Sequence, residues 1–185
     1  MVEYKQNPIF IDVKDHKLVI DENGYRLNVG IILVNRQNQL FLGRRIGHDD
    51  AWQFPQGGIR AHETPQQALF RELKEEIGLE PRHVRILGKT QDWLCYNLPR
   101  RLIRHNASPI CIGQKQRWFM LGLVGDEDDI NLKATQTPEF EEWRWVPYWQ
   151  PVYEVVNFKK DVYQQALIEL EESLIRYWQP HKEIV

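Results

Sequence analysis

The sequence predicts an α/β fold in which helices cover both faces of a mixed β-sheet. Three observations support this prediction. Apolar, β-branched runs that suit buried strands occur both before and after one strongly capped helix, and the chain then closes with an amphipathic helix. A chain with this order of elements is expected to pack as an α/β/α sandwich.

The length and composition indicate one ordinary globular domain. The chain has 185 residues, of which 42% are hydrophobic and 27% are charged. No apolar run approaches the roughly 18 residues that span a bilayer, and the N-terminus lacks the apolar core of a signal peptide. The two cysteines, Cys95 and Cys111, have neither metal-ligand nor disulfide-framework spacing. These features predict a cytoplasmic protein with free thiols and no membrane partner.

Short apolar runs predict the strands of the sheet. Two strands are expected before the capped helix and four after it, at residues 28–34, 40–42, 84–94, 110–112, 118–124 and 143–146. Residues 51–58 are expected to form a loop, because they are rich in aromatic, Pro and Gly residues. Residues 1–23 are an N-terminal extension, predicted either as an edge strand or as a disordered segment. Residues 100–109 form a polar, basic loop, and loops of this kind often carry function.

The last predicted element is a helix over residues 158–178. Apolar residues recur there at helical spacing, and the stripe is expected to pack against the sheet. Its members are Tyr163, Leu167, Leu170, Leu174 and Trp178.

The helix predicted over residues 64–77 has both ends fixed by local chemistry. Thr64 can cap the N-terminus, Pro65 suits the first helical position, and Gln67 completes a capping box with Thr64. At the other end, Gly78 supplies a left-handed stop. The sequence therefore defines this helix more sharply than any other element.

Three carboxylates on this helix, Glu72, Glu75 and Glu76, crowd the border of its apolar face. At 100° per residue, Glu76 lies only about 60° from the centre of that face, where burial and like-charge repulsion are both costly. A divalent cation would remove the conflict, and ligands that are all oxygen indicate Mg²⁺, with Mn²⁺ as the alternative. Taken alone, the pattern also fits a solvated helix in which Arg71 and Lys74 neutralise the acids.

The residues around the helix decide between these interpretations. From Gly57 the chain has five residues, then Glu63, then seven residues, and then the run RELKEEIGL that begins at Arg71. This spacing resembles the Nudix box, G-x5-E-x7-R-E-U-x-E-E-x-G-U with U bulky and apolar, at every fixed position. The resemblance implies a Nudix hydrolase domain over residues 24–180, an enzyme that cleaves phosphoanhydride bonds.

The resemblance also implies roles for the residues of the box. The expected metal ligands and catalytic groups are the carboxylates of Glu72, Glu75 and Glu76, joined at the metal by the carbonyl of Gly57. Glu63 and Arg71 are expected to form a structural ion pair. One carboxylate must accept the proton of the attacking water, and the sequence leaves open which one does so.

Further segments extend the resemblance over roughly residues 24–178. They include GYRLNVG at 24–30, WQFPQGG at 52–58, IGQKQRW at 112–118 and TPEF at 137–140. Together these segments are similar to the bacterial RNA pyrophosphohydrolase subfamily, which converts 5′-triphosphate RNA to 5′-monophosphate RNA and so promotes mRNA decay. The same subfamily includes diadenosine polyphosphate hydrolases, so a dinucleoside or nucleoside polyphosphate is the alternative substrate. A non-catalytic Nudix-fold binding module is less supported, because a pure binder has no need for clustered metal ligands.

By the same resemblance, Glu139 is a fourth catalytic and metal-binding carboxylate, although it also belongs to an acidic segment. Arg26, Gln114 and Lys115 match positions expected to contact substrate phosphates, where cationic and amide donors suit phosphate oxygens. Arg26 is open to a second interpretation, as a structural ion pair at the start of a strand.

A second set of positions matches a pocket for a base near the 5′ end of single-stranded RNA. Holding a base between a guanidinium plane and an apolar surface is sound chemistry for such a substrate. Val156 and Phe158 fit equally well as core residues ahead of the last helix. The members of the set are Arg45, Tyr96, Val156, Phe158 and Lys159.

The charges divide into two neighbouring stretches of opposite sign. Residues 81–118 hold eight Lys or Arg against Asp92 alone, a balance of +7, and residues 119–142 hold seven acids against Lys133, a balance of −6. A polyanionic substrate held near metal ions would fit this division. On charge alone, however, two solvated surface segments explain it better.

Overall fold

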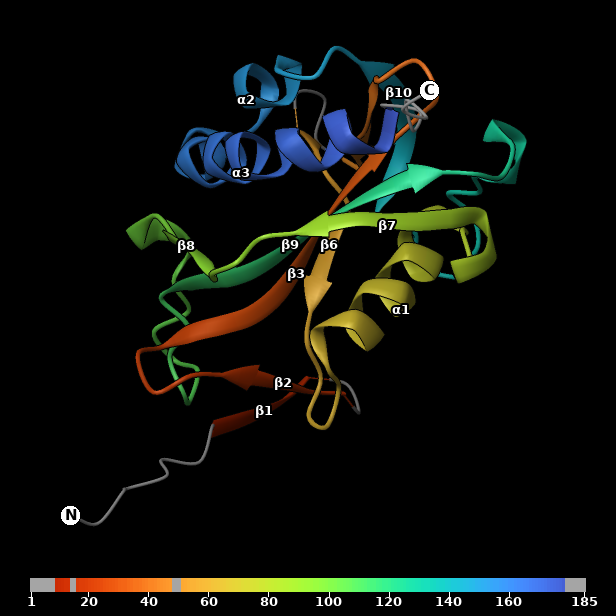
Figure 1. Cartoon of the computed structure of the whole chain (residues 1–185). Coiled ribbons are helices and arrows are strands. Elements are labelled where there is room, and N and C mark those ends of the chain that lie inside the picture. The colour runs from red at the N-terminus through yellow and green to blue at the C-terminus, as the bar shows by residue number, and fades with distance from the viewer. Residues whose placement is uncertain (1–8, 14–15, 48–50, 179–185) are drawn as a thin grey trace, which may run out of the picture.

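The computed structural model describes residues 9–13, 16–47 and 51–178, with side chains described from Leu18 to Tyr177. Within these residues, one mixed sheet of ten strands lies between two layers of helix, as Figure 1 shows. Helix α1 (Pro65–Ile77) covers one face, and helices α2 (Gln150–Glu154) and α3 (Lys160–Trp178) lie on the other. The predicted α/β/α sandwich is confirmed.

The sheet is organised around one long parallel pair of strands, β3 and β9. β9 also pairs antiparallel with β7 and β8, and β3 pairs antiparallel with β2, β4 and β6. The strands are β1 (Ile9–Val13), β2 (His16–Ile20), β3 (Tyr25–Val34), β4 (Leu40–Arg45), β5 (Trp52–Gln53), β6 (Gln56–Gly58), β7 (Val84–Lys89), β8 (Leu94–Asn97), β9 (Gly113–Leu123) and β10 (Phe140–Val146).

The continuous apolar run in β3 reflects burial on both of its faces. Ile31 and Leu33 belong to the apolar cluster that packs against α1, whereas Ile32 and Val34 belong to the cluster that packs against α3. All four side chains are at most 1% exposed. A strand at the centre of a sandwich needs apolar residues at every position, and the strand predicted over residues 28–34 is therefore confirmed.

The capping chemistry of α1 is also as predicted. The backbone N–H of Gln67 donates to the Thr64 hydroxyl, and the backbone N–H of Thr64 donates to the Gln67 side chain. Gly78 ends the helix with φ 75°, in the left-handed region that favours glycine. The apolar face, which includes Leu69 and Leu73, is fully buried against the sheet.

The closing helix α3 begins at Lys160, two residues later than predicted, because residues 157–159 form a short 3-10 turn. Four residues of the predicted stripe are buried, namely Tyr163, Leu167, Leu170 and Leu174. The side chain of Trp178 lies outside the described residues. Buried Tyr163 also accepts a hydrogen bond from the backbone N–H of Phe54, which ties α3 to the segment that precedes α1.

Two strand predictions after α1 are wrong. The predicted strand at residues 84–94 is two strands, β7 and β8, separated at residues 90–93, where the Thr90 hydroxyl accepts a hydrogen bond from the backbone N–H of Trp118. Residues 110–112 are not a strand. Ile112 makes two backbone hydrogen bonds, one to Gly24 and one to Leu98. Its apolar side chain is exposed and is not part of the sheet core.

Two further segments contain strands: residues 51–58, which were predicted as a loop, and residues 1–23, for which an edge strand was one of two predictions. The predicted loop at residues 51–58 includes the short strands β5 and β6, because Gly57 and Gly58 pair with β3. The strands β1 and β2 form an antiparallel pair at the edge of the sheet, within the extension at residues 1–23. Among the described residues, no helix is long and apolar enough to cross a membrane.

Candidate active site

Four acidic side chains from two distant parts of the chain meet at one pocket. This carboxylate pocket has a volume of about 420 Å³ and lies between α1 and the segment that leads into β10. Helix α1 contributes three acids at helical spacing, and a loop contributes the fourth. They are Glu72, Glu75, Glu76 and Glu139. The structure thus brings together all four carboxylates that the sequence singled out.

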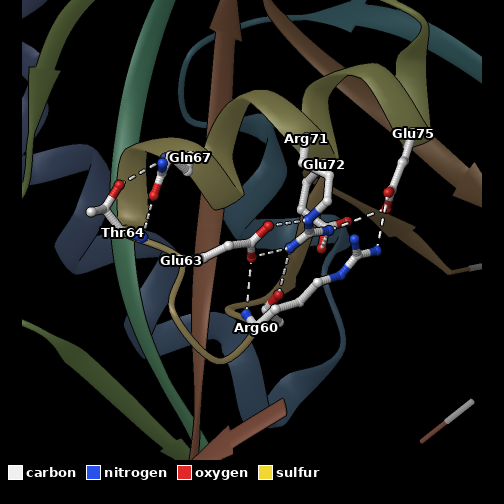
Figure 2. Close-up of polar contacts among 8 residues, drawn as sticks. Arg60, Glu63, Thr64, Gln67, Arg71, Glu72 and Glu75 are labelled. Carbon is white, nitrogen blue, oxygen red and sulfur yellow. Dashed lines mark hydrogen bonds and ion pairs between the residues drawn. The ribbon is translucent and has the colours of Figure 1, made fainter. Parts of the chain in front are cut away.

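Arg71 connects these carboxylates to the loop before the helix (Figure 2). Its Nε and Nη2 donate to the two carboxylate oxygens of Glu63 at 2.6 and 2.8 Å, and Nη2 also donates to the Gly58 carbonyl at 2.8 Å. Nη1 donates to Glu72 at 2.5 Å and to Glu75 at 3.1 Å. Burial by itself would lower the pKa of Arg71, but the hydrogen bonds and charges of its acidic partners raise it. The guanidinium therefore stays charged.

Glu63 closes the loop that leads into α1. It accepts the backbone N–H of Arg60 at 2.9 Å as well as the two bonds from Arg71. Burial would raise the pKa of Glu63, yet the hydrogen bonds from Arg71 and Arg60 lower it below its usual value. The Arg60 guanidinium in turn lies 3.1 Å from Glu75. The loop is thus fixed to the helix by two ion pairs, Glu63 with Arg71 and Arg60 with Glu75.

The carboxylate of Glu72 occupies the space beside Gly57. A Cβ atom at Gly57 would lie only 1.8 Å from Cδ of Glu72, which no side chain tolerates. Burial raises the pKa of Glu72, and the charge and hydrogen bond of Arg71 oppose that shift. A glycine is therefore required at this position by close approach rather than by backbone conformation.

Glu76, like Glu72, is buried, with 8% of the residue exposed. One of its oxygens accepts the backbone N–H of Gln56 at 2.9 Å. Its pKa lies well above the usual value, first because of burial and then because of the neighbouring negative charges of Glu72 and Glu139. A buried carboxylate among like charges is unfavourable by itself and favourable beside a cation.

Glu139 reaches the pocket from the segment before β10 and forms an ion pair with Arg45. Its Oε1 lies 2.8 Å from Nε of Arg45, although the N–H of that nitrogen is not aligned for a hydrogen bond with any described residue. We therefore regard this contact as electrostatic rather than as a directed hydrogen bond.

The donor chemistry of the pocket suits a divalent cation. Among the described residues, no three acidic, His or Cys side chains surround one point as metal ligands, because each carboxylate is turned toward an arginine or a backbone N–H. All four donors nevertheless line the same cavity, and all are oxygens. The space left by the absent Cβ at Gly57 is filled by the Glu72 carboxylate, which lies close to the backbone there. An all-oxygen set of this kind fits Mg²⁺ or Mn²⁺.

A buried network of amides lies next to this pocket, and the sequence analysis did not find it. The Nε2 of Gln116 donates to Asn28 at 3.0 Å and to Gln56 at 3.2 Å. Lys159 donates to Gln53 at 3.1 Å and to Gln56 at 3.3 Å. Gln56 thus joins the network through its side chain and Glu76 through its backbone. A buried amide network has no periodicity or spacing that would reveal it in a single sequence.

Lys159 lies where the predicted metal and substrate residues meet. Only 7% of the residue is exposed, and its ammonium lies 5.8 Å from the ring centroid of Tyr96. Burial and the positive charge of Arg45 lower the pKa of Lys159 to about 8, while Glu76 and Glu139 oppose the shift. The Lys159 ammonium therefore interacts electrostatically with the carboxylate pocket and with the predicted base pocket.

Arg26 and Gln114 face each other across the parallel pair of β3 and β9. Nε of Arg26 and Oε1 of Gln114 are both buried, and neither has a hydrogen-bond partner among the described residues. The structure does not bring Lys115 to them. Lys115 projects from the opposite face of β9, and its ammonium lies 3.2 Å from the carboxylate of Asp21.

The predicted base-pocket residues are only partly gathered. The rings of Tyr96 and Phe158 lie 5.7 Å apart, and Phe158 packs against the core cluster on the α3 side. Arg45 and Val156 are more open, with 42% of the Arg45 side chain and 40% of Val156 exposed. An apolar wall and an accessible guanidinium are thus both present, and Phe158 serves the core as well as the wall.

Comparison with known proteins places these features in a wider group. The sequence model of the NUDIX domain matches residues 24–166. The RNA pyrophosphohydrolase of Hydrogenovibrio crunogenus is 62% identical over 160 residues, which cover 86% of this chain and 96% of that protein. The RNA pyrophosphohydrolase of a Marinomonas species is 58% identical over 158 residues, which cover 85% of this chain and 98% of that protein.

Solved structures show the same fold at low sequence identity. The dihydroneopterin triphosphate pyrophosphohydrolase of E. coli superposes with a TM-score of 0.62 at 19% identity, over 77% of this chain and 94% of that one. The Ap4A hydrolase of C. elegans, in a binary complex, superposes with a TM-score of 0.56 at 16% identity, over 81% of this chain and 98% of that one. At these identities the likeness concerns the fold alone.

Proposed function

This chain belongs to the NUDIX domain family and is a Nudix pyrophosphohydrolase, and on this premise we propose that it acts on the 5′-triphosphate end of single-stranded RNA. Water would cleave the triphosphate to leave 5′-monophosphate RNA and release pyrophosphate, which would expose the transcript to decay in the cytoplasm. The observation that carries the proposal is the carboxylate pocket beside the buried Lys159 and its amide network.

Nudix hydrolases use divalent metal ions, and we propose Mg²⁺ here, with Mn²⁺ as the alternative. Glu72, Glu75, Glu76 and Glu139 would hold the ion, together with the carbonyl of Gly57. When bound, such an ion neutralises phosphate charge and activates water. Arg71 keeps Glu72 and Glu75 in place for this role, and a carboxylate of the pocket accepts the proton of the attacking water.

The remaining polar groups would bind the substrate. Arg26 and Gln114 carry buried polar atoms without partners among the described residues, and they suit the oxygens of a triphosphate. Lys159 adds a cation between these residues and the carboxylates. We assign no phosphate contact to Lys115, because Asp21 already holds its ammonium.

The wall formed by Tyr96 and Phe158 would hold a base near the 5′ end, with Arg45 and Val156 at its open side. Aromatic and guanidinium surfaces are the usual platforms for unstacked bases in single-stranded RNA. The names of the RNA pyrophosphohydrolase relatives support this choice of substrate over a dinucleoside polyphosphate.

The test is a direct comparison of kcat/KM in Mg²⁺ on 5′-triphosphate RNA and on diadenosine tetraphosphate. RNA is expected to be the better substrate, and Glu75→Gln is expected to abolish turnover of both while leaving the fold intact, because the Glu75 side chain is 39% exposed. Circular dichroism and the Tm establish that the variant is folded. A clear preference for the dinucleotide would overturn the RNA assignment.

Phe158→Ala tests the proposed base-binding wall of Tyr96 and Phe158 independently of the carboxylate pocket. This change is expected to lower kcat/KM on RNA by about tenfold, because stacking on one aromatic ring is lost, and to lower it less on diadenosine tetraphosphate. Equal losses on both substrates would mean that Phe158 acts through the core and not through a base.

A further inference from the structure

A second pocket, also of about 420 Å³, lies beneath the basic loop and is separate from the carboxylate pocket. Its floor is formed by Leu18 and Ile20 of β2, and Leu102 and Pro109 of the loop close over it. We call this cavity the loop pocket. A volume of this size can enclose a small organic ring system.

Two arginines border an otherwise apolar lining. Arg26 and Arg104 both line the loop pocket, which is walled mainly by aliphatic side chains. The side chain of neither arginine forms an ion pair or a hydrogen bond in the described part of the chain, and Nε of Arg26 is buried. An apolar cavity between two unneutralised cations suits a ligand that is flat and apolar in the middle and anionic on either side.

Arg26 joins the loop pocket to the proposed substrate site. It pairs in register with Ile20 of the pocket floor on one side and with Gln114 on the other. Its charge also acts on Tyr96 and Lys159. A ligand whose phosphates meet Arg26 in the substrate site would therefore have the loop pocket next to it.

The charge of the surrounding segment favours a polyanionic strand. Residues 93–125 contain no Asp or Glu, and the loop within them adds Arg100 and Arg101 to Arg104. A dinucleoside polyphosphate carries its phosphates in one short run, which Arg26 and its neighbours would already occupy. A further cation in the pocket lining, Arg104, instead suits a ligand whose phosphates recur along its length, as those of RNA do.

We propose that the loop pocket binds a base of the RNA strand downstream of the 5′ end. The inference rests on the proposed RNA substrate and adds a second site for the strand. The base would fill the apolar cavity, and the flanking phosphates would lie against Arg26 and Arg104, a combination typical of single-stranded RNA binding. The protein would then favour RNA that is long enough to reach this pocket.

The two cysteines of the chain provide a direct test of occupancy. Cys111 lines the loop pocket, whereas Cys95 is exposed on β8 and lies outside that lining. Glu75→Gln protein in Mg²⁺ would be treated with N-ethylmaleimide, and the modification of each cysteine followed by mass spectrometry. Bound 5′-triphosphate octanucleotide should slow modification of Cys111 at least fivefold and leave Cys95 unchanged. ATP should protect neither thiol.

The outcomes separate this proposal from the proposed function. If anisotropy shows saturating binding of the octanucleotide and Cys111 still reacts at its unprotected rate, the loop pocket does not hold the strand. Protection by diadenosine tetraphosphate and not by RNA would assign the pocket to a second nucleoside, which also overturns the inference. If wild-type protein prefers neither RNA nor longer RNA in turnover, the proposed function itself fails.

Two variants provide a readout from kinetics. Ala107→Leu would fill the pocket, and Arg104→Gln would remove one of its cations. Each is expected to lower the ratio of kcat/KM on the octanucleotide to kcat/KM on ATP by about tenfold. Arg36→Gln makes the same change of charge at an exposed turn and should keep the wild-type ratio. A ratio unchanged in both pocket variants would contradict the proposal.

Discussion

At the scale of single residues, the absence of a Cβ atom at Gly57 leaves the space that the carboxylate of Glu72, a proposed metal ligand, occupies. We predict that Gly57→Ala lowers kcat/KM by about 10- to 100-fold, the effect typical of disturbing the support of a metal ligand. The reason is that a Cβ atom would lie 1.8 Å from Cδ of Glu72 and displace its carboxylate.

The measurement is steady-state turnover at several Mg²⁺ concentrations. Gly122→Ala serves as the matched control, because a Cβ atom there would meet its nearest neighbours at 3.3 to 3.5 Å. Equal activity of the two alanine variants would show that the position of the Glu72 carboxylate does not matter for turnover.

Arg71 is the second residue whose individual chemistry can be tested. We predict that Arg71→Lys lowers the free energy of unfolding by about 3 kcal/mol, because a single ammonium cannot replace the forked contacts to Glu63, Gly58 and the helix carboxylates. Urea denaturation measures the change. Arg36→Lys, at an exposed position, is the control and should alter the free energy of unfolding by less than about 0.5 kcal/mol.

Single residues also show where prediction from sequence succeeds and fails. The acids of α1 were found because their spacing is local and fixed by the helix. The hydrogen bond between Gln116 and Asn28 joins residues 88 positions apart. The sequence around either residue therefore contains no pattern that predicts it. Lys115 was grouped with Gln114 because both match family positions for phosphate contacts, although neighbouring residues of a strand project from opposite faces.

At the scale of elements, the N-terminus of α1 is held by a reciprocal pair of hydrogen bonds. We predict that Thr64→Ala lowers the free energy of unfolding by about 1 kcal/mol, with a decrease in Tm of about 2 to 4 °C. Because Gln67 bonds back to Thr64, the loss in the double variant should be smaller than the sum of the two single losses. Thermal denaturation of the four proteins gives this comparison.

Gln66→Ala is the matched control for the capping box. Gln66 is exposed and lies beside Gln67 on the same turn, so the same chemical change is made without loss of a cap. Strictly additive losses at Thr64 and Gln67 would mean that the two hydrogen bonds act independently.

The elements differ in how far the sequence determined them. α1 was predicted correctly because its end signals are local, and β3 because burial on both faces demands a continuous apolar run. The break between β7 and β8 was missed, since it depends on a hydrogen bond from Trp118 to Thr90 across the sheet. Ile112 was misassigned because its apolar side chain is exposed in a loop.

At the scale of the whole molecule, metal binding should be measurable as an increase in the free energy of unfolding. We predict that Mg²⁺ at about 100 times its Kd raises the free energy of unfolding by about 2.7 kcal/mol, because the folded chain gathers four carboxylates that the unfolded chain disperses. Urea denaturation with and without Mg²⁺ measures this effect independently of activity.

Glu76→Gln is the informative variant for the same measurement. Its stability should respond much less to Mg²⁺, whereas Glu172→Gln, on an exposed turn of α3, should respond as the wild type does. Equal responses of all three proteins would place the metal away from the carboxylate pocket.

The parallel pairing of β3 and β9 has a consequence for the time course of folding. The two strands are separated in the chain by α1 and by the whole of β7 and β8. A helix of 13 residues is marginal in water until a partner covers its apolar face, and part of that partner, β9, is synthesised after the helix. Long-range pairing of this kind slows folding. The helix that carries the proposed metal-binding acids is thus synthesised early but stabilised late. In the interval its apolar face is open to chaperones and to aggregation.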